Sequence, residues 1–282
     1  MFRTLFLFLV LLAIIALACG FSVDLPDAPT AGPEVTDEIL VEVPDSDEVN
    51  LTLKFGAGKL DLAPGAGDAL VSGTATYNIS DFEPVINTSA GKVEIAQGEY
   101  RLKSLNLSEY KNEWQLKLGT TPMELSINAG AYDGNFEFGG LALTNLTIKD
   151  GAAGVDLAFS EPNQSEMSVF RYETGASNVK LTGLANANFS TMTFDGGAGN
   201  FQLDFTGDLQ RDATVTLECG LSDLQLVIPE GLNAKVTVEG AAVNVNHSSG
   251  WSQSSHTYLQ DASGPTLTVV VKMSAGNVTI TD

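Results

Sequence analysis

The sequence predicts an all-β chain whose main part is a single-stranded, right-handed parallel β-helix, also called a β-solenoid. The first observation is a recurring phrase, a small-residue turn followed by an apolar–polar–apolar triplet, as in G-A-S-N-V-K-L at Gly175 and G-A-G-N-F-Q-L at Gly197. The second is its spacing of about 20–24 residues in the middle of the chain, the period of a stacked solenoid. The third is a composition of 44% apolar residues, 17% charged residues and 28 glycines, which suits short strands and tight turns.

The N-terminus reads as a targeting segment. Arg3 precedes an apolar run from Leu5 to Ala18, which ends directly before Cys19. The phrase I-A-L-A-C-G resembles the lipobox of bacterial lipoproteins, which implies that residues 1–19 form a lipoprotein signal peptide and that Cys19 carries acyl chains. The alternative is an ordinary secretory signal in which Cys19 is incidental.

Residues 20–48 are rich in Pro, Asp, Glu, Thr and Ala and poor in aromatic side chains. A segment of this composition cannot bury enough apolar surface to offset the entropy lost on ordering. We therefore expect a disordered acidic tether between the anchor and the folded part.

From Val49 onward, apolar and polar residues alternate with the period of strands, for example in L-T-L-K-F and W-Q-L-K-L. We expect an N-terminal β subdomain over residues 49–113 and the solenoid over residues 114–282. The segment Glu99–Asn112 is less regular and is expected to be an inserted loop or a seam between the two.

Aligning the repeats predicts two inward ladders of apolar side chains, because rungs of a solenoid stack at roughly 4.8 Å and share one core. The first ladder is Val155, Val179, Phe201 and Leu224, and the second is Leu157, Leu181, Leu203 and Leu226. An antiparallel β-sandwich is the alternative architecture, since it also contains many short, evenly spaced strands.

Charge and cysteine content exclude several classes of function. The formal net charge of −21 argues against nucleic-acid binding, which needs Lys and Arg patches. Only Cys219 remains besides Cys19, so no disulfide framework is expected, and Cys219 reads as a small core residue. No catalytic, cofactor or metal-binding motif is recognisable, so we expect neither an enzyme nor a bound cofactor or metal.

One acidic pattern is a candidate site. The middle residue of the recurring triplet is acidic in the first copies and then becomes basic or polar, as at Lys180, Gln202 and Gln225. If the copies are in register, the carboxylates would share one face and attract a cation or a basic partner. Paired carboxylates also occur in enzymes that cleave glycosidic bonds, but an ordinary solvated acidic face is the simpler interpretation. The acidic positions are Asp61, Glu94, Glu137 and Asp156.

The loop over residues 246–265 contains two aromatic residues and both histidines of the chain. Trp251 and Tyr258 could contact a sugar ring or a protein partner, or could cap the last rung of the solenoid. His247 and His256 lie in the same loop, but two histidines without a third ligand do not make a metal site.

The chain resembles bacterial envelope proteins in which an adhesin-like β-solenoid follows a toast-rack N-terminal domain. The N-terminal resemblance lies in L-T-L-K-F-G-A-G-K-L-D-L-A-P-G at Leu51–Gly65 and in E-P-V-I-N at Glu83–Asn87. The C-terminal resemblance covers Gly231–Ile280, with its G-W loop and the phrase S-A-G-N-V-T-I. The resemblance implies a fold and carries no catalytic residues.

Together, these features predict a lipid-anchored, extracytoplasmic binding protein of the cell envelope that is adhesin-like and not an enzyme. Its expected partners are the membrane, through the anchor, and an envelope protein or a cell-surface polysaccharide. One alternative, implied by the family resemblance alone, is an accessory of an envelope-stress or cell-wall-antibiotic response. Another is a carbohydrate-active enzyme that uses the acidic residues.

Overall fold

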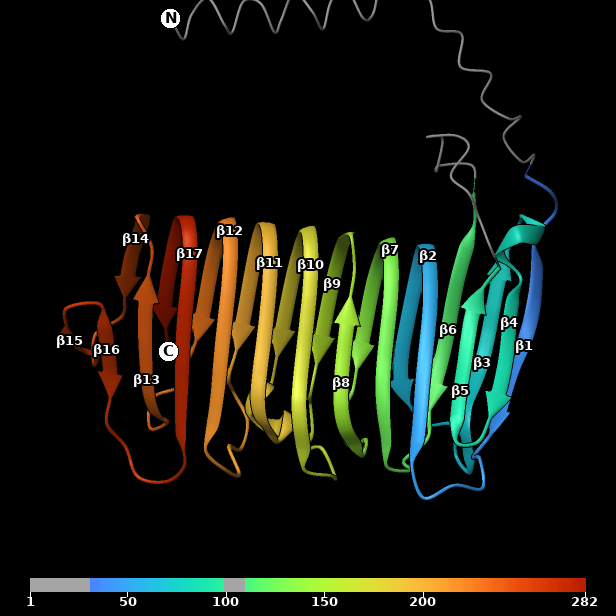
Figure 1. Cartoon of the computed structure of the whole chain (residues 1–282), viewed down its shortest axis with the longest axis horizontal. Helices are drawn as coiled ribbons and strands as arrows, with labels where there is room; N and C mark the ends of the chain where they lie inside the picture. Colours follow the sequence, from blue (N-terminus) through green and yellow to red (C-terminus); the bar gives the residue numbers. More distant parts are fainter. Residues whose placement is uncertain (1–30, 99–109) are drawn as a thin grey trace, which may run out of the picture.

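The computed structural model describes residues 31–98 and 110–282 as one elongated stack of strands (Figure 1). The predicted all-β fold is confirmed, and neighbouring rungs in the middle of the stack pair in parallel, as a solenoid requires. The expected signal peptide with Cys19, and most of the expected seam, lie outside the described residues. Within the described ranges, no helix has the length and apolar character needed to cross a membrane.

A typical rung is one long strand that bends at its middle. The first half of β10 (Met167–Thr182) pairs with β8 (Leu143–Lys149), and its second half pairs with β9 (Ala152–Ala158). The first halves of all rungs form what we call the first sheet, and the second halves form the second sheet. Five other rungs in the described part of the chain are single strands of this kind: β2 (Val49–Pro64), β7 (Met123–Glu137), β11 (Phe189–Asp204), β12 (Ala213–Val227) and β17 (Thr266–Thr281).

Stacked glycines make the bend between the two sheets possible. A Cβ atom on Gly197 would lie 2.5 Å from the carbonyl oxygen of Gly175, and one on Gly220 would lie 2.1 Å from that of Gly197. No side chain fits at such distances, so the recurring glycine of the repeat is required by the close approach of successive backbones.

The last strand of the chain does not lie at the end of the stack. β17 (Thr266–Thr281) pairs in parallel with β12 on one side and with β13 (Asn233–Glu239) and β14 (Ala242–His247) on the other. The C-terminal strand is therefore inserted between the rung of β12 and the rung formed earlier in the chain by β13 and β14.

Antiparallel strands cover the C-terminal end in part. β16 (Thr257–Gln260) pairs with β13, and β15 (Ser252–Ser254) pairs with β16, which extends the first sheet by two strands. The second sheet has no such extension, because β14 pairs with β17 alone in the described part of the chain.

The N-terminal end is built from β5 (Lys92–Gln97) and β6 (Asn112–Leu118), which pair in parallel with the two halves of β2. Antiparallel β4 (Pro84–Ser89) pairs with β5, β3 (Ala69–Tyr77) with β6, and β1 (Val35–Glu42) with β3. The expected disordered tether is therefore wrong over Val35–Glu42. Its Ile39 and Val41 are buried, so this segment supplies enough apolar surface to order itself against β3.

Both predicted inward ladders are confirmed, and they share one core. Val179 aligns with Val155 and Phe201, and Phe201 aligns with Leu224; the leucine ladder follows the same register. A single cluster of buried apolar side chains extends from Ile39 to Ile280. The boundary expected between residues 113 and 114 therefore does not coincide with a break in the core.

Candidate functional site

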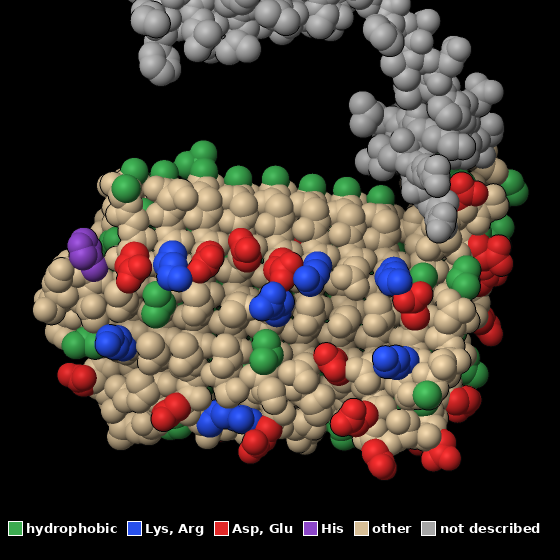
Figure 2. Space-filling model, in the orientation of Figure 1, with side chains coloured by type: hydrophobic (Ala, Val, Ile, Leu, Met, Phe, Trp, Pro, Cys, Tyr) green, Lys and Arg blue, Asp and Glu red, His purple; other side chains and the backbone are tan. Residues whose placement is uncertain are grey.

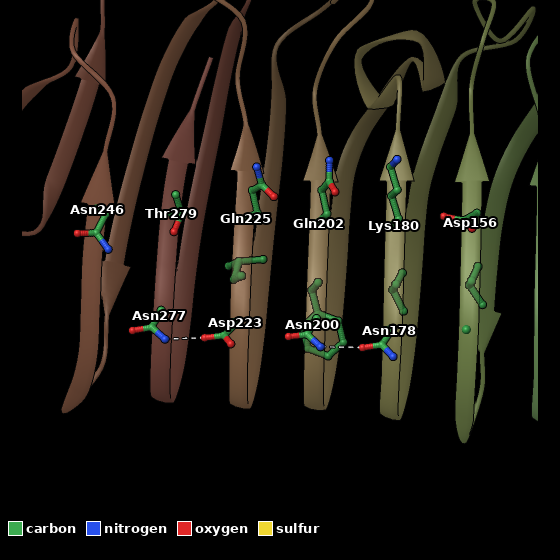
Figure 3. A pocket seen from close by; sticks show the side chains of 15 residues that line it. Asp156, Asn178, Lys180, Asn200, Gln202, Asp223, Gln225, Asn246, Asn277 and Thr279 are labelled. Carbon is green, nitrogen blue, oxygen red and sulfur yellow. Dashed lines mark hydrogen bonds between the residues drawn. The ribbon is translucent and has the colours of Figure 1, made fainter.

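An open groove of about 800 Å³ runs along the outward surface of the second sheet (Figure 3). It crosses six neighbouring strands, β9, β10, β11, β12, β17 and β14, so its long axis follows the stack and not the strands. Inward residues such as Val179 and Leu224 belong to the core, and the outward residues on either side of them form two polar rows.

The first row consists of amide and carboxylate side chains, one from each strand except β9, which has Gly154 at this position. Asn200 donates to the side-chain oxygen of Asn178 at 2.9 Å, and Asn277 donates to Asp223 at 2.6 Å (Figure 3). Asn244 donates to Asn277 at 3.2 Å. These hydrogen bonds hold the row along the stack and leave further amide groups facing solvent.

The second row lies two residues further along each strand, at a distance of roughly 6.6 Å along the strand direction. Its side chains are outward and are exposed or half-buried (Figure 3). Three of its six side chains are amides, so the groove offers both hydrogen-bond donors and acceptors on each side. The row consists of Asp156, Lys180, Gln202, Gln225, Thr279 and Asn246.

The two sheets differ in charge. The groove contains the charged side chains Asp156, Asp223 and Lys180. The first sheet, in contrast, presents a line of charged side chains along the stack (Figure 2), with Lys149 and Glu173 at 3.0 Å and Lys272 and Glu218 at 3.0 Å. The groove is thus mainly an amide surface on an acidic protein.

The expected acidic ladder is not formed. Asp61 aligns with Asn135, and Asn135 aligns with Asp156, so an amide separates these two carboxylates on the second sheet. Glu94 lies on β5 in the first sheet, where it forms an ion pair with Lys54 at 2.6 Å.

Glu137 shows why the alignment was wrong. It accepts hydrogen bonds from the backbone N–H groups of Gly139 at 2.6 Å and Ser160 at 3.1 Å, so it stabilises the turn after β7. The triplet of this rung is G-N-F at positions 134–136, two positions before the expected F-E-F, with Asn135 outward and Phe136 buried. Among the residues that the structure describes, no three His, Cys, Asp or Glu side chains are placed to hold a metal ion.

A second polar cluster lies inside the bend of the solenoid. The carboxylate of Asp150 accepts hydrogen bonds from the Tyr172 hydroxyl at 2.8 Å, from the Tyr132 hydroxyl at 3.4 Å and from Thr174. Thr174 also contacts the Ser177 hydroxyl at 2.6 Å. Burial raises the pKa of Asp150 above its ordinary value, and the hydroxyl donors counteract that effect in part. The cluster fixes the corner of the rung.

Trp251 and Tyr258, expected as contact or capping residues, are only 7% and 4% exposed. Tyr258 lies on β16, aligned with Val236 of β13, and its ring centroid is 5.3 Å from that of His247. Both aromatic side chains belong to the core cluster, so they are placed to cap the last rung and offer little surface for stacking on a sugar.

The first row of the groove was not singled out from the sequence, although its signal was present. The residue before each triplet is Asn or Asp in S-N-V-K-L, G-N-F-Q-L, S-D-L-Q-L and G-N-V-T-I. Because this residue is two positions before the outward middle residue, it must face the same side of the sheet.

Comparison with known families gives one match over a large part of the chain. A family described as the N-terminal domain of toast_rack, DUF2154, matches residues 30–182. No curated protein matches the chain.

Among solved structures, a candidate cell adhesion protein from Clostridium sporogenes is 18% identical with a TM-score of 0.50, covering 88% of this chain and 99% of its own. A candidate lipid-binding protein from Parabacteroides distasonis is 11% identical with a TM-score of 0.38, covering 88% of this chain and 97% of its own. A candidate adhesin from Bacteroides fragilis is 9% identical with a TM-score of 0.33, with the same coverages of 88% and 97%.

Proposed function

This chain belongs to the family of the toast_rack N-terminal domain, and from that premise we propose that it is an adhesin-like, non-enzymatic binding protein of the cell surface. The Clostridium sporogenes structure, a candidate cell adhesion protein, shares the fold and supports this direction. The proposal places recognition on the solenoid surface itself, where a repeated scaffold presents the same polar groups at regular intervals.

The observation that carries the proposal is the groove of the second sheet. It is open and spans six strands, so it suits an extended chain lying along the stack better than a small enclosed molecule. It contains no ion pair: the carboxylate of Asp223 accepts from Asn277, and Lys180 aligns with Asp156 on one side and Gln202 on the other without forming an ion pair with Asp156. Such a surface binds without activating a nucleophile.

The ligand class that fits best is a neutral cell-surface polysaccharide. Sugar hydroxyls both donate and accept hydrogen bonds, which matches rows of Asn and Gln side chains. A polyanionic glycan would meet the carboxylates of Asp156 and Asp223 with only Lys180 to offset them, in a protein of formal net charge −21.

Binding to immobilised polysaccharides tests the proposal. We expect the full chain to be retained by linear neutral glucans or mannans and not by alginate or pectate. The double variant Gln202→Glu, Gln225→Glu should weaken retention roughly tenfold or more, a loss of about 1.4 kcal/mol, by replacing amide donors with carboxylates.

The chain offers a matched control for this variant. Thr191 and Thr214 lie on the same two strands, aligned with each other and exposed on the first sheet, so Thr191→Glu, Thr214→Glu adds the same charge outside the groove. The control variant should bind as the wild type does. The proposal fails if no neutral polysaccharide is retained, or if both double variants lose binding equally.

We further propose that Cys19 holds the protein at the membrane through acyl chains, each buried CH₂ group contributing about 0.8 kcal/mol. The support is the lipobox-like phrase alone, since Cys19 lies outside the described residues. Labelled fatty acid should be incorporated by the wild type and not by Cys19→Ser. Wild-type protein that stays unlabelled would leave a cleaved secretory signal as the explanation.

Cross-linking in living cells with mass spectrometry separates this proposal from the alternative of a regulatory accessory. Recovery of cell-surface polysaccharide favours the adhesin-like role. Recovery of one recurrent sensor protein of the envelope, lost in the groove variant, would favour the envelope-stress alternative.

A further inference from the structure

We propose that the free edge of β14 is a docking site for one extended strand of a partner protein, which would add to the second sheet. This site adjoins the end of the groove, whose rows include Asn244 and Asn246 of the same strand, but it uses the backbone edge of β14 and not the outward side chains. A strand edge presents a row of unpaired backbone N–H and C=O groups, and a partner segment can bind it by main-chain hydrogen bonds.

Four strands in the described part of the chain pair on one side only, and three of them are protected. β1 carries the carboxylates Asp37, Glu38 and Glu42, β4 begins with Pro84, and β15 is three residues long. Charged side chains, proline and short length are the devices by which proteins prevent edge-to-edge pairing. Each of these three edges thus carries at least one such device.

β14 has none of these devices. Its sequence, A-V-N-V-N-H, contains no Asp, Glu, Lys, Arg or Pro over six residues. β4 is equally long and uncharged and is set apart only by its first residue, Pro84, so β14 is the one described edge that lacks all three devices, and an edge of this kind indicates a binding surface.

The side chains of β14 that continue the core are also incompletely covered. Val245 aligns with Val278, which is 0% exposed, yet Val245 and Val243 remain half-buried. His247 aligns with the buried Ile280 and is exposed. The inward ladder of the second sheet is thus covered only in part at this end, where Tyr258 lies beside His247 and the two valines remain half-buried.

The shape of this end limits what can bind. The first sheet continues beyond β13 through β16 and β15, whereas the second sheet stops at β14 (Figure 1), so a step two strands deep, roughly 10 Å, lies beside β14. A second copy stacked on this end would place its β1 and β3 in the two free positions beside β14. At the same level of the first sheet, both positions are already filled by β16 and β15. The β4 of the second copy would therefore have no position in the first sheet. A single strand fits where a whole solenoid does not.

The occupant is therefore an extended polypeptide segment with apolar side chains at alternate positions and no net charge. Apolar residues on one side would cover Val243 and Val245, and polar residues on the other side would lie beside Asn244 and Asn246. Alternation follows from the pleat of the sheet, and neutrality from the absence of charge on β14.

The test uses the full chain and a synthetic probe, the acetylated and amidated peptide Thr-Val-Thr-Val-Thr-Val-Thr. We expect the peptide to slow hydrogen–deuterium exchange in residues 242–247. The same peptide with N-methylated valines should give no protection, because it lacks the N–H groups that pair with the edge. This comparison needs no variant and so stands even if a substitution in β14 prevents folding.

Val243→Lys places a charge on the inward side of the edge and should weaken peptide binding tenfold or more. Leu40→Lys, on the exposed side of the protected strand β1, is the matched control and should change nothing. Absence of protection, protection at β1 or β4 instead, or equal binding of the N-methylated peptide would overturn the proposal. Concentration-dependent oligomers of the chain alone that Val243→Lys dissociates would also overturn it, because the occupant would then be a second copy.

Discussion

The side-chain amide of Asn277 donates a 2.6 Å hydrogen bond to the carboxylate of Asp223, although 54 positions separate the two residues in the sequence. The bond joins β17 to β12. After β7, this is the one place where neighbouring rungs of the stack do not follow each other in the sequence. In the sequence, the terminal rung of β13 and β14 and the β15–β16 hairpin come before β17, but in the structure β17 lies between that rung and β12. The inward residues of the second half of β17, Val278 and Ile280, are consequently fully buried.

Ile280→Ala should destabilise the protein strongly, although Ile280 lies near the end of β17. Ile280 is fully buried, and truncating a buried isoleucine to alanine costs about 2–5 kcal/mol. Urea unfolding of the full chain measures the effect. Thr279→Ala, an outward neighbour on the same strand, should cost no more than about 0.5 kcal/mol. Equal losses for the two variants would mean that β17 frays like an ordinary terminus and is not an integral rung.

Gly199→Ala should destabilise the protein more than Gly231→Ala. Both glycines have positive φ angles, +149° and +89°, so both variants bear a conformational cost. Only at Gly199 would the new Cβ meet a neighbour, the carbonyl oxygen of Ser177 at 1.8 Å, whereas Gly231 has open space.

Thermal and urea unfolding should therefore show a free energy of unfolding that is about 1–3 kcal/mol lower for Gly199→Ala than for Gly231→Ala. The difference isolates steric contact between rungs from backbone strain. Similar values for both variants would contradict the close stacking of neighbouring rungs at this corner.

The register of the inward ladders could be predicted because the repeat fixes it. Each copy supplies one apolar residue to each ladder at constant spacing from the glycine turn, and Val179 and Leu181 accordingly align with Phe201 and Leu203. The same reasoning failed at Glu137. The phrase G-N-F-E-F contains two overlapping triplets, G-N-F and F-E-F, and the sequence does not show which of them aligns with the triplets of the other rungs. The outward residue is Asn135.

Long-range topology was beyond the reach of the repeat. Nothing in the local pattern of β17 distinguishes a strand inserted beside β12 from one added after β14, because both positions bury the same face. Likewise, the composition of residues 20–48 predicted disorder, whereas Ile39 and Val41 are ordered by pairing of β1 with β3. Tertiary partners decided both cases, and they are not visible in a window of sequence.

Asp150→Asn should change how stability depends on pH. Burial raises the pKa of Asp150 in the folded protein above its ordinary 3.8, so the folded state binds this proton more tightly than the unfolded state does. The free energy of unfolding contributed by this group therefore falls as pH rises from about 3.8 through the raised pKa, and is constant above it. The asparagine variant lacks that decline.

Urea midpoints of wild type and Asp150→Asn between pH 4 and pH 7 measure the difference. We expect the wild type to lose stability relative to the variant over the lower part of this range. Tyr172→Phe, which removes the donor at 2.8 Å, should steepen the decline, because the ionised carboxylate then loses a hydrogen bond. Parallel pH profiles for wild type and Asp150→Asn would contradict a raised pKa.

Cys219 should report global unfolding when its thiol is labelled. Its side chain is buried in the inward corner of β12, aligned with Met273, and burial together with the nearby Asp195 raises its pKa to about 12. Since the thiolate is the reactive form, the folded protein should react with a thiol reagent only through opening of the fold.

In a Cys19→Ser background, the labelling rate of Cys219 should be very slow at pH 8 and should rise with urea along the unfolding transition. The exposed reference is a variant that carries both Ala198→Cys and Cys219→Ala. Position 198 is exposed on the neighbouring rung, so a thiol placed there should react at once. The two thiols lie on adjacent rungs but on opposite sides of the backbone. If Cys219 reacts without urea at a rate close to that of the reference, the corner between β12 and β17 opens locally. That result would contradict the description of β17 as an integral rung of the stack.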